Sequence, residues 1–128
     1  MDTVYVVEYD DYLRIAIGEY LQSQGYKVFI FENIYRALTH IQSLNKKPSA
    51  IILNLEMENG FILLDKLAKD EVRVPIYLMY RDPRSLPELL SSNIILSNGP
   101  LDLNEMERCI SKAMSESIKK SGAAHFVD

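Results

Sequence analysis

The chain has 128 residues, 48% hydrophobic and 25% charged, which is the composition of one globular domain. Its 14 Lys and Arg against 18 Asp and Glu give a net charge of -4, and this argues against nucleic acid as the partner. A single cysteine excludes an internal disulfide and favours a reducing compartment. The apolar runs are too short to span a bilayer, so we expect a cytoplasmic domain with no membrane segment.

Five short apolar runs rich in β-branched residues predict β-strands. They do not alternate apolar with polar side chains, which is typical of strands that helices cover on both faces of a parallel sheet. The runs are 4–7, 28–31, 50–53, 76–79 and 94–96.

Stretches of helical spacing alternate with these runs and predict five helices. The clearest carries Leu13 and Ile17 on one face, the weakest (86–90) is interrupted by Pro87, and Asp102 is placed to cap the last. The stretches are 13–21, 37–44, 61–68, 86–90 and 103–114.

This alternation of strands and helices predicts an open parallel α/β sheet with helices on both faces, because crossovers between parallel strands are right-handed. In such sheets the functional side chains lie at the carboxyl ends of the strands. The segments that follow the strands there are 8–11, 54–59, 80–82 and 97–100.

Short motifs within and beside these elements stand in a familiar order. They are found in 6–14, 25–28, 33–38, 74–79 and 100–103. Together they resemble the receiver domain of bacterial two-component response regulators, over roughly residues 3–115. The resemblance implies a flavodoxin-like (βα)5, doubly wound sheet of order 2-1-3-4-5 within a domain of residues 1–115. Residues 116–128 would then be a helix extension and a tail or the start of a linker.

The resemblance also implies a site that has lost its chemistry. Receiver domains transfer a phosphoryl group from a histidine kinase to an aspartate ending the third strand. An acidic pair holds Mg²⁺ there, and a Ser or Thr and a Lys bind the phosphoryl oxygens. The corresponding positions here are Asn54 (acceptor), Glu8, Tyr9 and Asp10 (acidic loop), Tyr80 (Ser or Thr) and Gly99 (Lys). An amide at the acceptor position has no carboxylate oxygen with which to attack phosphorus.

We therefore expect a pseudo-receiver that signals through protein binding without aspartyl phosphorylation. It is not expected to be an enzyme or to need a cofactor, and Mg²⁺ binding should be weak or absent. The partner would be a protein or an attached output domain, and a homodimer would use the face formed by the fourth helix, fifth strand and fifth helix. The residues expected to contact a partner are Tyr9, Tyr12, Tyr80, Met106, Cys109 and Ile110.

Two other functions are compatible with the sequence. One is a phosphorelay receiver that is still phosphorylated at another acid, Asp10 or Asp11. The more remote one is a small flavodoxin-like enzyme, although no nucleophile, base or Gly-rich cofactor loop follows the strands.

Several polar residues near the strand ends have simpler predicted roles. The carboxylates of Glu8, Asp10, Glu56 and Glu58 are expected to form a solvated acidic rim in preference to a cation site. His40 is expected at the surface, since no spacing suits a zinc site. Cys109 is expected to be a buried or half-buried structural thiol.

Overall fold

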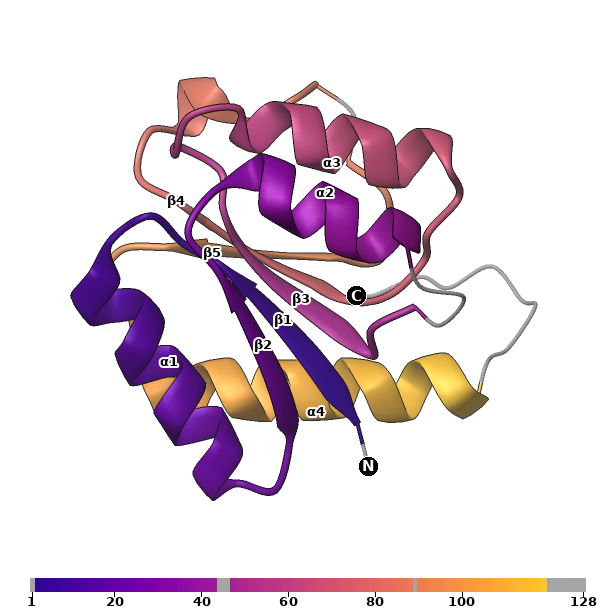
Figure 1. The fold of residues 1–128 in the computed structure, drawn as a ribbon. Coiled ribbons are helices and arrows are strands. Elements are labelled where there is room, and N and C mark those ends of the chain that lie inside the picture. The colour runs from indigo at the N-terminus through magenta and orange to yellow at the C-terminus, as the bar shows by residue number, and fades with distance from the viewer. Residues whose placement is uncertain (1, 44–46, 89, 120–128) are drawn as a thin grey trace.

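The computed structural model describes residues 2–43, 47–88 and 90–119, and within them five strands form one parallel sheet (Figure 1). The strands are β1 (Thr3–Val7), β2 (Lys27–Phe31), β3 (Ala50–Asn54), β4 (Ile76–Tyr80) and β5 (Ile94–Asn98). Their order in the sheet is β2-β1-β3-β4-β5. The predicted flavodoxin-like fold and strand order are confirmed.

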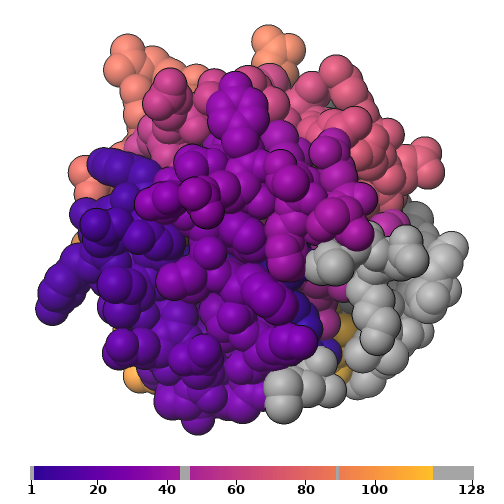
Figure 2. All heavy atoms as spheres, viewed as in Figure 1, coloured from indigo at the N-terminus to yellow at the C-terminus, as the bar shows by residue number. Residues whose placement is uncertain are grey.

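In the same described residues, four α-helices cover the two faces of this sheet. They are α1 (Asp11–Ser23), α2 (Ile34–Ser43), α3 (Gly60–Lys69) and α4 (Leu103–Lys119). Helices α2 and α3 lie on one face, and α1 and α4 lie on the other (Figure 1). The front of the molecule in this view is built mainly from α1, β2 and α2 (Figure 2).

Strand β1 shows why the predicted runs are apolar at every position. Tyr5 and Val7 belong to the core cluster under α2 and α3, whereas Val4 and Val6 belong to the cluster under α1 and α4. All four side chains are buried. A strand in the middle of a sheet with two covered faces has no solvent side, so period-two alternation disappears.

The predicted helix over 86–90 is wrong. The described residues between β4 and β5 contain only a short 3-10 turn, η1 (Pro83–Ser85), and no α-helix. Leu86 has extended backbone angles, φ -73° and ψ 139°. The ring of Pro87 disfavours helical angles at the residue before it and removes an N–H donor, which explains the break. The fourth helix of the expected dimer face is therefore missing from the described chain.

Helix α4 begins as predicted. Asp102 Oδ1 accepts the backbone N–H of Glu105 at 3.0 Å, which caps the first turn. The helix runs without a break past residue 115 to Lys119, and the predicted tail over 120–128 lies outside the described residues. Within the described chain no helix combines the length and apolar character needed to cross a membrane.

Candidate functional site

The carboxyl ends of β1 and β3 lie side by side, and they bring the predicted acidic loop and acceptor position together. Glu8 follows β1, and Asn54 is the last residue of β3. The Asn54 side-chain Nδ2 donates to both Glu8 carboxylate oxygens, at 3.2 Å to Oε1 and 3.1 Å to Oε2. An amide donor thus faces the carboxylate directly across the two neighbouring strands.

Glu8 is not part of a solvated rim, contrary to the sequence expectation. Its residue is only 1% exposed, and Oε2 also accepts the Asp10 backbone N–H at 3.1 Å. The Glu8 N–H in turn donates to the carbonyl of Phe31 at 3.1 Å, which draws the residue into the sheet. A buried carboxylate is stable only where donors face it, and here the Asn54 amide and a backbone N–H do so.

Arg14 is a residue of this site that the sequence analysis missed. It is 9% exposed, and its Nη1 donates to the carbonyl oxygens of Glu8 at 2.9 Å and Tyr9 at 3.2 Å. Its Nη2 forms an ion pair with Asp11 at 2.5 Å. A guanidinium therefore fastens the acidic loop to α1. The helical period offered a signal, because Arg14 lies on the same buried face of α1 as Ile17.

The side chains of the rest of this loop face solvent. Asp10 Oδ1 accepts the Leu13 N–H at 2.9 Å, so this carboxylate caps α1. Tyr9 is 63% exposed and Tyr12 is 87% exposed, and neither fills the space at the acceptor position. Tyr80, by contrast, is half-buried and packs against the core cluster under α2 and α3.

The loop between β3 and α3 makes a tight turn. A Cβ on Gly60 would lie 2.3 Å from the Leu55 carbonyl oxygen, so only glycine fits without moving the backbone. Glu56 and Glu58 on this loop are exposed, as expected for the rim. Glu56 is nevertheless bound, because its carboxylate accepts hydrogen bonds from the chain that follows β4. The hydrogen bonds from the backbone N–H groups of Asp82 and, next, Arg81 hold the pKa of Glu56 below its ordinary value.

The lysine position carries no cation. Gly99 follows β5 in the left-handed region, with φ 106°, and is exposed. Left-handed angles favour glycine, so the turn itself accounts for the residue.

The magnesium ion implied by the resemblance does not fit these residues. Both oxygens of Glu8 already accept N–H donors, and the acidic position beside it is Tyr9. In the described part of the chain no group of three or more His, Cys, Asp or Glu could hold a metal. Magnesium requires oxygen ligands, and an amide nitrogen occupies the space in front of Glu8.

Two of the residues expected to contact a partner are buried in the core. Met106 and Ile110 are 0% exposed and face the sheet from α4, since they lie on its apolar stripe. Cys109 is half-buried, and burial, followed by its hydrogen bond to Glu105, raises the pKa of its thiol. The half-burial of this thiol matches the expectation.

His40 is not a surface histidine. Its ring packs against Tyr5 at 5.3 Å, Phe29 at 4.8 Å and Phe31 at 5.3 Å between centroids. Among the described residues its buried Nε2 has no hydrogen-bond partner. The buried face of α2 therefore includes His40 in addition to the apolar residues of the predicted stripe.

Comparison with known proteins identifies the fold. No family model and no curated protein matches the chain. A CheY-like receiver domain protein from Methanospirillum hungatei superposes with TM-score 0.78 at 15% identity, covering 94% of this chain and 99% of that one. TrrA from Thermotoga maritima, solved with Mg²⁺ and BeF, gives 0.74 at 22% identity, covering 88% and 99%.

A longer relative of the same fold is also similar. NtrX from Brucella abortus, solved in complex with ATP, gives TM-score 0.73 at 16% identity over 92% of this chain, which spans 28% of the length of NtrX. The chain thus has the receiver-domain fold of response regulators. At these identities the likeness is one of fold, and the function has to be argued from the site.

Proposed function

We propose that this chain is a pseudo-receiver, a receiver-fold signalling domain that binds a protein partner and is not phosphorylated on an aspartate. One observation carries the proposal: the residue at the acceptor position is an amide whose nitrogen donates to both oxygens of Glu8. A carboxylate at the same position would instead place two like charges against each other in a buried site.

The chemistry of phosphoryl transfer supports this proposal. The transfer needs an oxygen nucleophile, a metal that neutralises the developing charge, and fixed cations or hydroxyls around the phosphoryl oxygens. Asn54 has no nucleophilic carboxylate, and the donors in front of Glu8 leave no place for magnesium. The remaining two positions hold Tyr80 and Gly99, which supply neither a serine-like hydroxyl nor an ammonium group.

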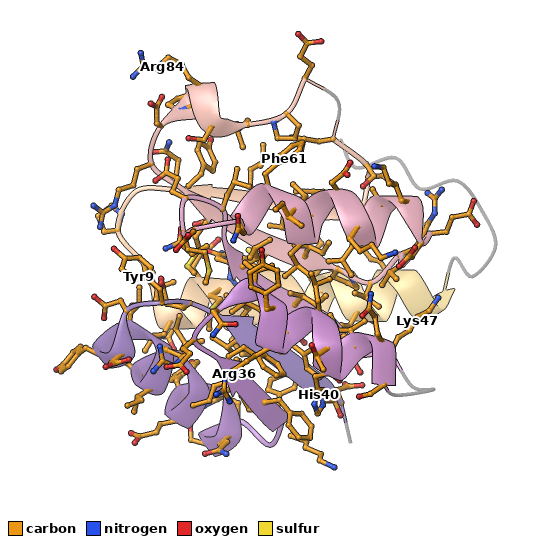
Figure 3. The ribbon with its side chains drawn as sticks, turned by 45° about the horizontal axis from the view of Figure 1, so that its top comes forward. Tyr9, Arg36, His40, Lys47, Phe61 and Arg84 are labelled. Carbon is orange, nitrogen blue, oxygen red and sulfur yellow. The ribbon has the colours of Figure 1, made fainter. Side chains whose placement is uncertain are left out.

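The proposed partner surface is the carboxyl edge of the sheet. Tyr9 projects from the loop after β1, Tyr12 from the first turn of α1, and Phe61, 52% exposed, from the start of α3. The Asn54–Glu8 hydrogen bonds hold these two loops together. Figure 3, turned so that the top of Figure 1 comes forward, labels Tyr9 at the left of the molecule and Phe61 beside α3. Exposed aromatic rings are frequent anchors of protein interfaces.

The partner is a protein or an output domain on the same polypeptide, and the cytoplasm is the proposed location. The NtrX comparison supports an attached domain, because the receiver-like part is a minor share of that longer chain. The aromatic edge is tested by binding to a protein captured from the native host. Tyr9→Ala and Tyr12→Ala should weaken binding, while Tyr35→Ala, which removes a 62% exposed ring from α2, should not. Equal weakening by Tyr35→Ala would contradict the assignment of this edge.

The absence of phosphoryl chemistry is tested with magnesium and beryllofluoride. A ligand that binds only the native state at a hundredfold excess over Kd adds about 2.7 kcal/mol of stability. We expect no change in Tm for this chain, with TrrA as the positive control because it was solved with these ions. A clear rise in Tm would refute the proposal and favour residual chemistry at Asp10 or Asp11.

A further inference from the structure

The chain that follows β4 begins the connection to β5. Its first part, the strap (residues 81–86), contains η1 and its own local hydrogen bonds. Asp82 Oδ1 caps the turn by accepting the Arg84 N–H at 2.9 Å, and the Ser85 N–H donates to the Asp82 carbonyl at 2.9 Å. These local bonds fix the shape of the strap, but they do not fix its position on the domain.

One carboxylate oxygen from another loop does fix that position. Glu56 Oε2 accepts the backbone N–H of Arg81 at 3.0 Å, the N–H of Asp82 at 2.6 Å and the hydroxyl of Ser85 at 3.2 Å. Donors that converge on one oxygen are the arrangement with which loops bind anions. Here the anion is a side chain of the protein itself.

Glu56 is in turn positioned by Asn54. The Asn54 Oδ1 accepts the Glu56 N–H at 3.0 Å, while its Nδ2 donates to Glu8. The amide therefore connects the buried carboxylate on one side with the clamping carboxylate on the other. An aspartate could accept the Glu56 N–H but could not donate to Glu8.

We infer that Glu56 is a built-in anion that clamps the strap closed, so that the Leu86 side chain stays packed on the core cluster under α2 and α3. Leu86 packs against that cluster, and the Asn98 side-chain amide donates to the Arg81 carbonyl at 3.2 Å. Loss of the Glu56 carboxylate should therefore open the strap without unfolding the sheet. This inference goes beyond the proposed function, because it concerns a contact that does not depend on whether any acid is phosphorylated.

Hydrogen exchange of individual amides tests the clamp directly, because the Arg81 and Asp82 amides are themselves the donors. In Glu56→Ala we expect exchange at these two amides to accelerate at least tenfold, and amides in β1 and α1 to keep their protection. Glu58→Gln is the matched control, since Glu58 is an exposed carboxylate of the same loop. It should leave both strap amides unchanged.

Trypsin provides a second, independent readout. Arg84 lies on the outer side of η1, its side chain is 90% exposed, and cleavage after it reports opening of the strap (Figure 3). Cleavage should be faster in Glu56→Ala and only slightly faster in Ser85→Ala, which removes one of the three donors. If Glu56→Ala fails to fold, Glu56→Gln, which removes the charge of the clamp, carries the same test. Unchanged exchange and cleavage in the Glu56 variants, or equal effects in Glu58→Gln, would overturn the inference.

Discussion

Two carboxylates at the same edge of the sheet have different roles, because Glu8 is buried and Glu56 is exposed. Glu8 is enclosed, and its donors are the Asn54 amide and the Asp10 backbone N–H. Glu56 is exposed, and its donors are backbone N–H groups and a hydroxyl of the strap. A buried charge without its donors is costly, whereas an exposed one is rehydrated by water.

Glu8 should therefore affect the stability of the whole domain, whereas Glu56 should affect only the local order of the strap. Substitutions around Glu8 should change the free energy of unfolding of the whole domain. Substitutions at Glu56 should change the protection of the strap and leave the unfolding transition in place. Four substitutions or conditions test this contrast, beginning with the largest expected effect.

Asn54→Asp should destabilise the domain most. Two carboxylates about 4 Å apart repel by on the order of 4 kcal/mol at an effective dielectric of 20, and we expect a loss of about 2–4 kcal/mol in urea unfolding at neutral pH. The loss should shrink in acid, because protonation of either carboxyl removes the repulsion. Adding Glu8→Gln restores one acid and one amide, so the double variant should recover most of the stability. A double variant less stable than Asn54→Asp would argue against a direct contact.

Arg14→Met should cost about 2 kcal/mol, since it removes charged donors from the carbonyl oxygens of Glu8 and Tyr9. Methionine keeps much of the apolar stem, so the measured loss reports mainly the guanidinium. Asp11→Asn is the control, because its carboxylate is 81% exposed and surface pairs contribute under about 1 kcal/mol. A loss of equal size in Asp11→Asn would show that the ion pair, not the carbonyl contacts, stabilises the loop.

Asp10→Ala should cost about 1 kcal/mol through the lost cap of α1, while Asp10→Asn should cost much less because its amide oxygen still accepts the Leu13 N–H. Thermal unfolding of both variants measures this difference. The same two variants also test whether Asp10 is an alternative phosphoacceptor. If Asp10 were a phosphoacceptor, both variants would abolish labelling regardless of their stability.

Acid should open the strap with little effect on the rest of the domain. The pKa of Glu56 is lowered by the N–H groups of Asp82 and Arg81, and that of Asp82 by Arg84. A carboxylate with a lowered folded-state pKa contributes stability above its ordinary pKa and loses it as the pH falls through the lowered value. Strap protection factors should therefore be constant near neutrality and fall only below the ordinary carboxyl range. Glu56→Gln should remove most of this dependence and leave the smaller part due to Asp82. A fall near neutral pH would contradict the assignment.

The sheet was predictable from the sequence because its signals are local and repeated. Five apolar runs and their helical spacers predict an open parallel sheet with right-handed crossovers, while the strand order was implied by the resemblance to receiver domains. The helix over 86–90 was wrong because apolar spacing outweighed Pro87 in the prediction, whereas in the structure Pro87 sets the extended angles of Leu86.

For the site, the sequence predicted residues that take part but not the contacts that they make. The resemblance to receiver domains placed Glu8 and Asn54 at the ends of neighbouring strands, but it did not indicate that Arg14, on the buried face of α1, binds the Glu8 carbonyl. Glu56 binds Arg81 and Asp82, 25 and 26 positions away, through their backbone N–H groups, and backbone donors carry no sequence signal. Met106 and Ile110 were expected to contact a partner although they lie on the apolar stripe of the last helix, and such a stripe faces the core.

The most direct test of the central claim is the intact mass of the protein after incubation with Mg²⁺ and a small-molecule phosphodonor. An active receiver domain in the same tube serves as the positive control. With an amide at position 54 held against Glu8, the mass should remain that of the unmodified chain. An acid-labile adduct of one phosphoryl group on this chain would contradict the account.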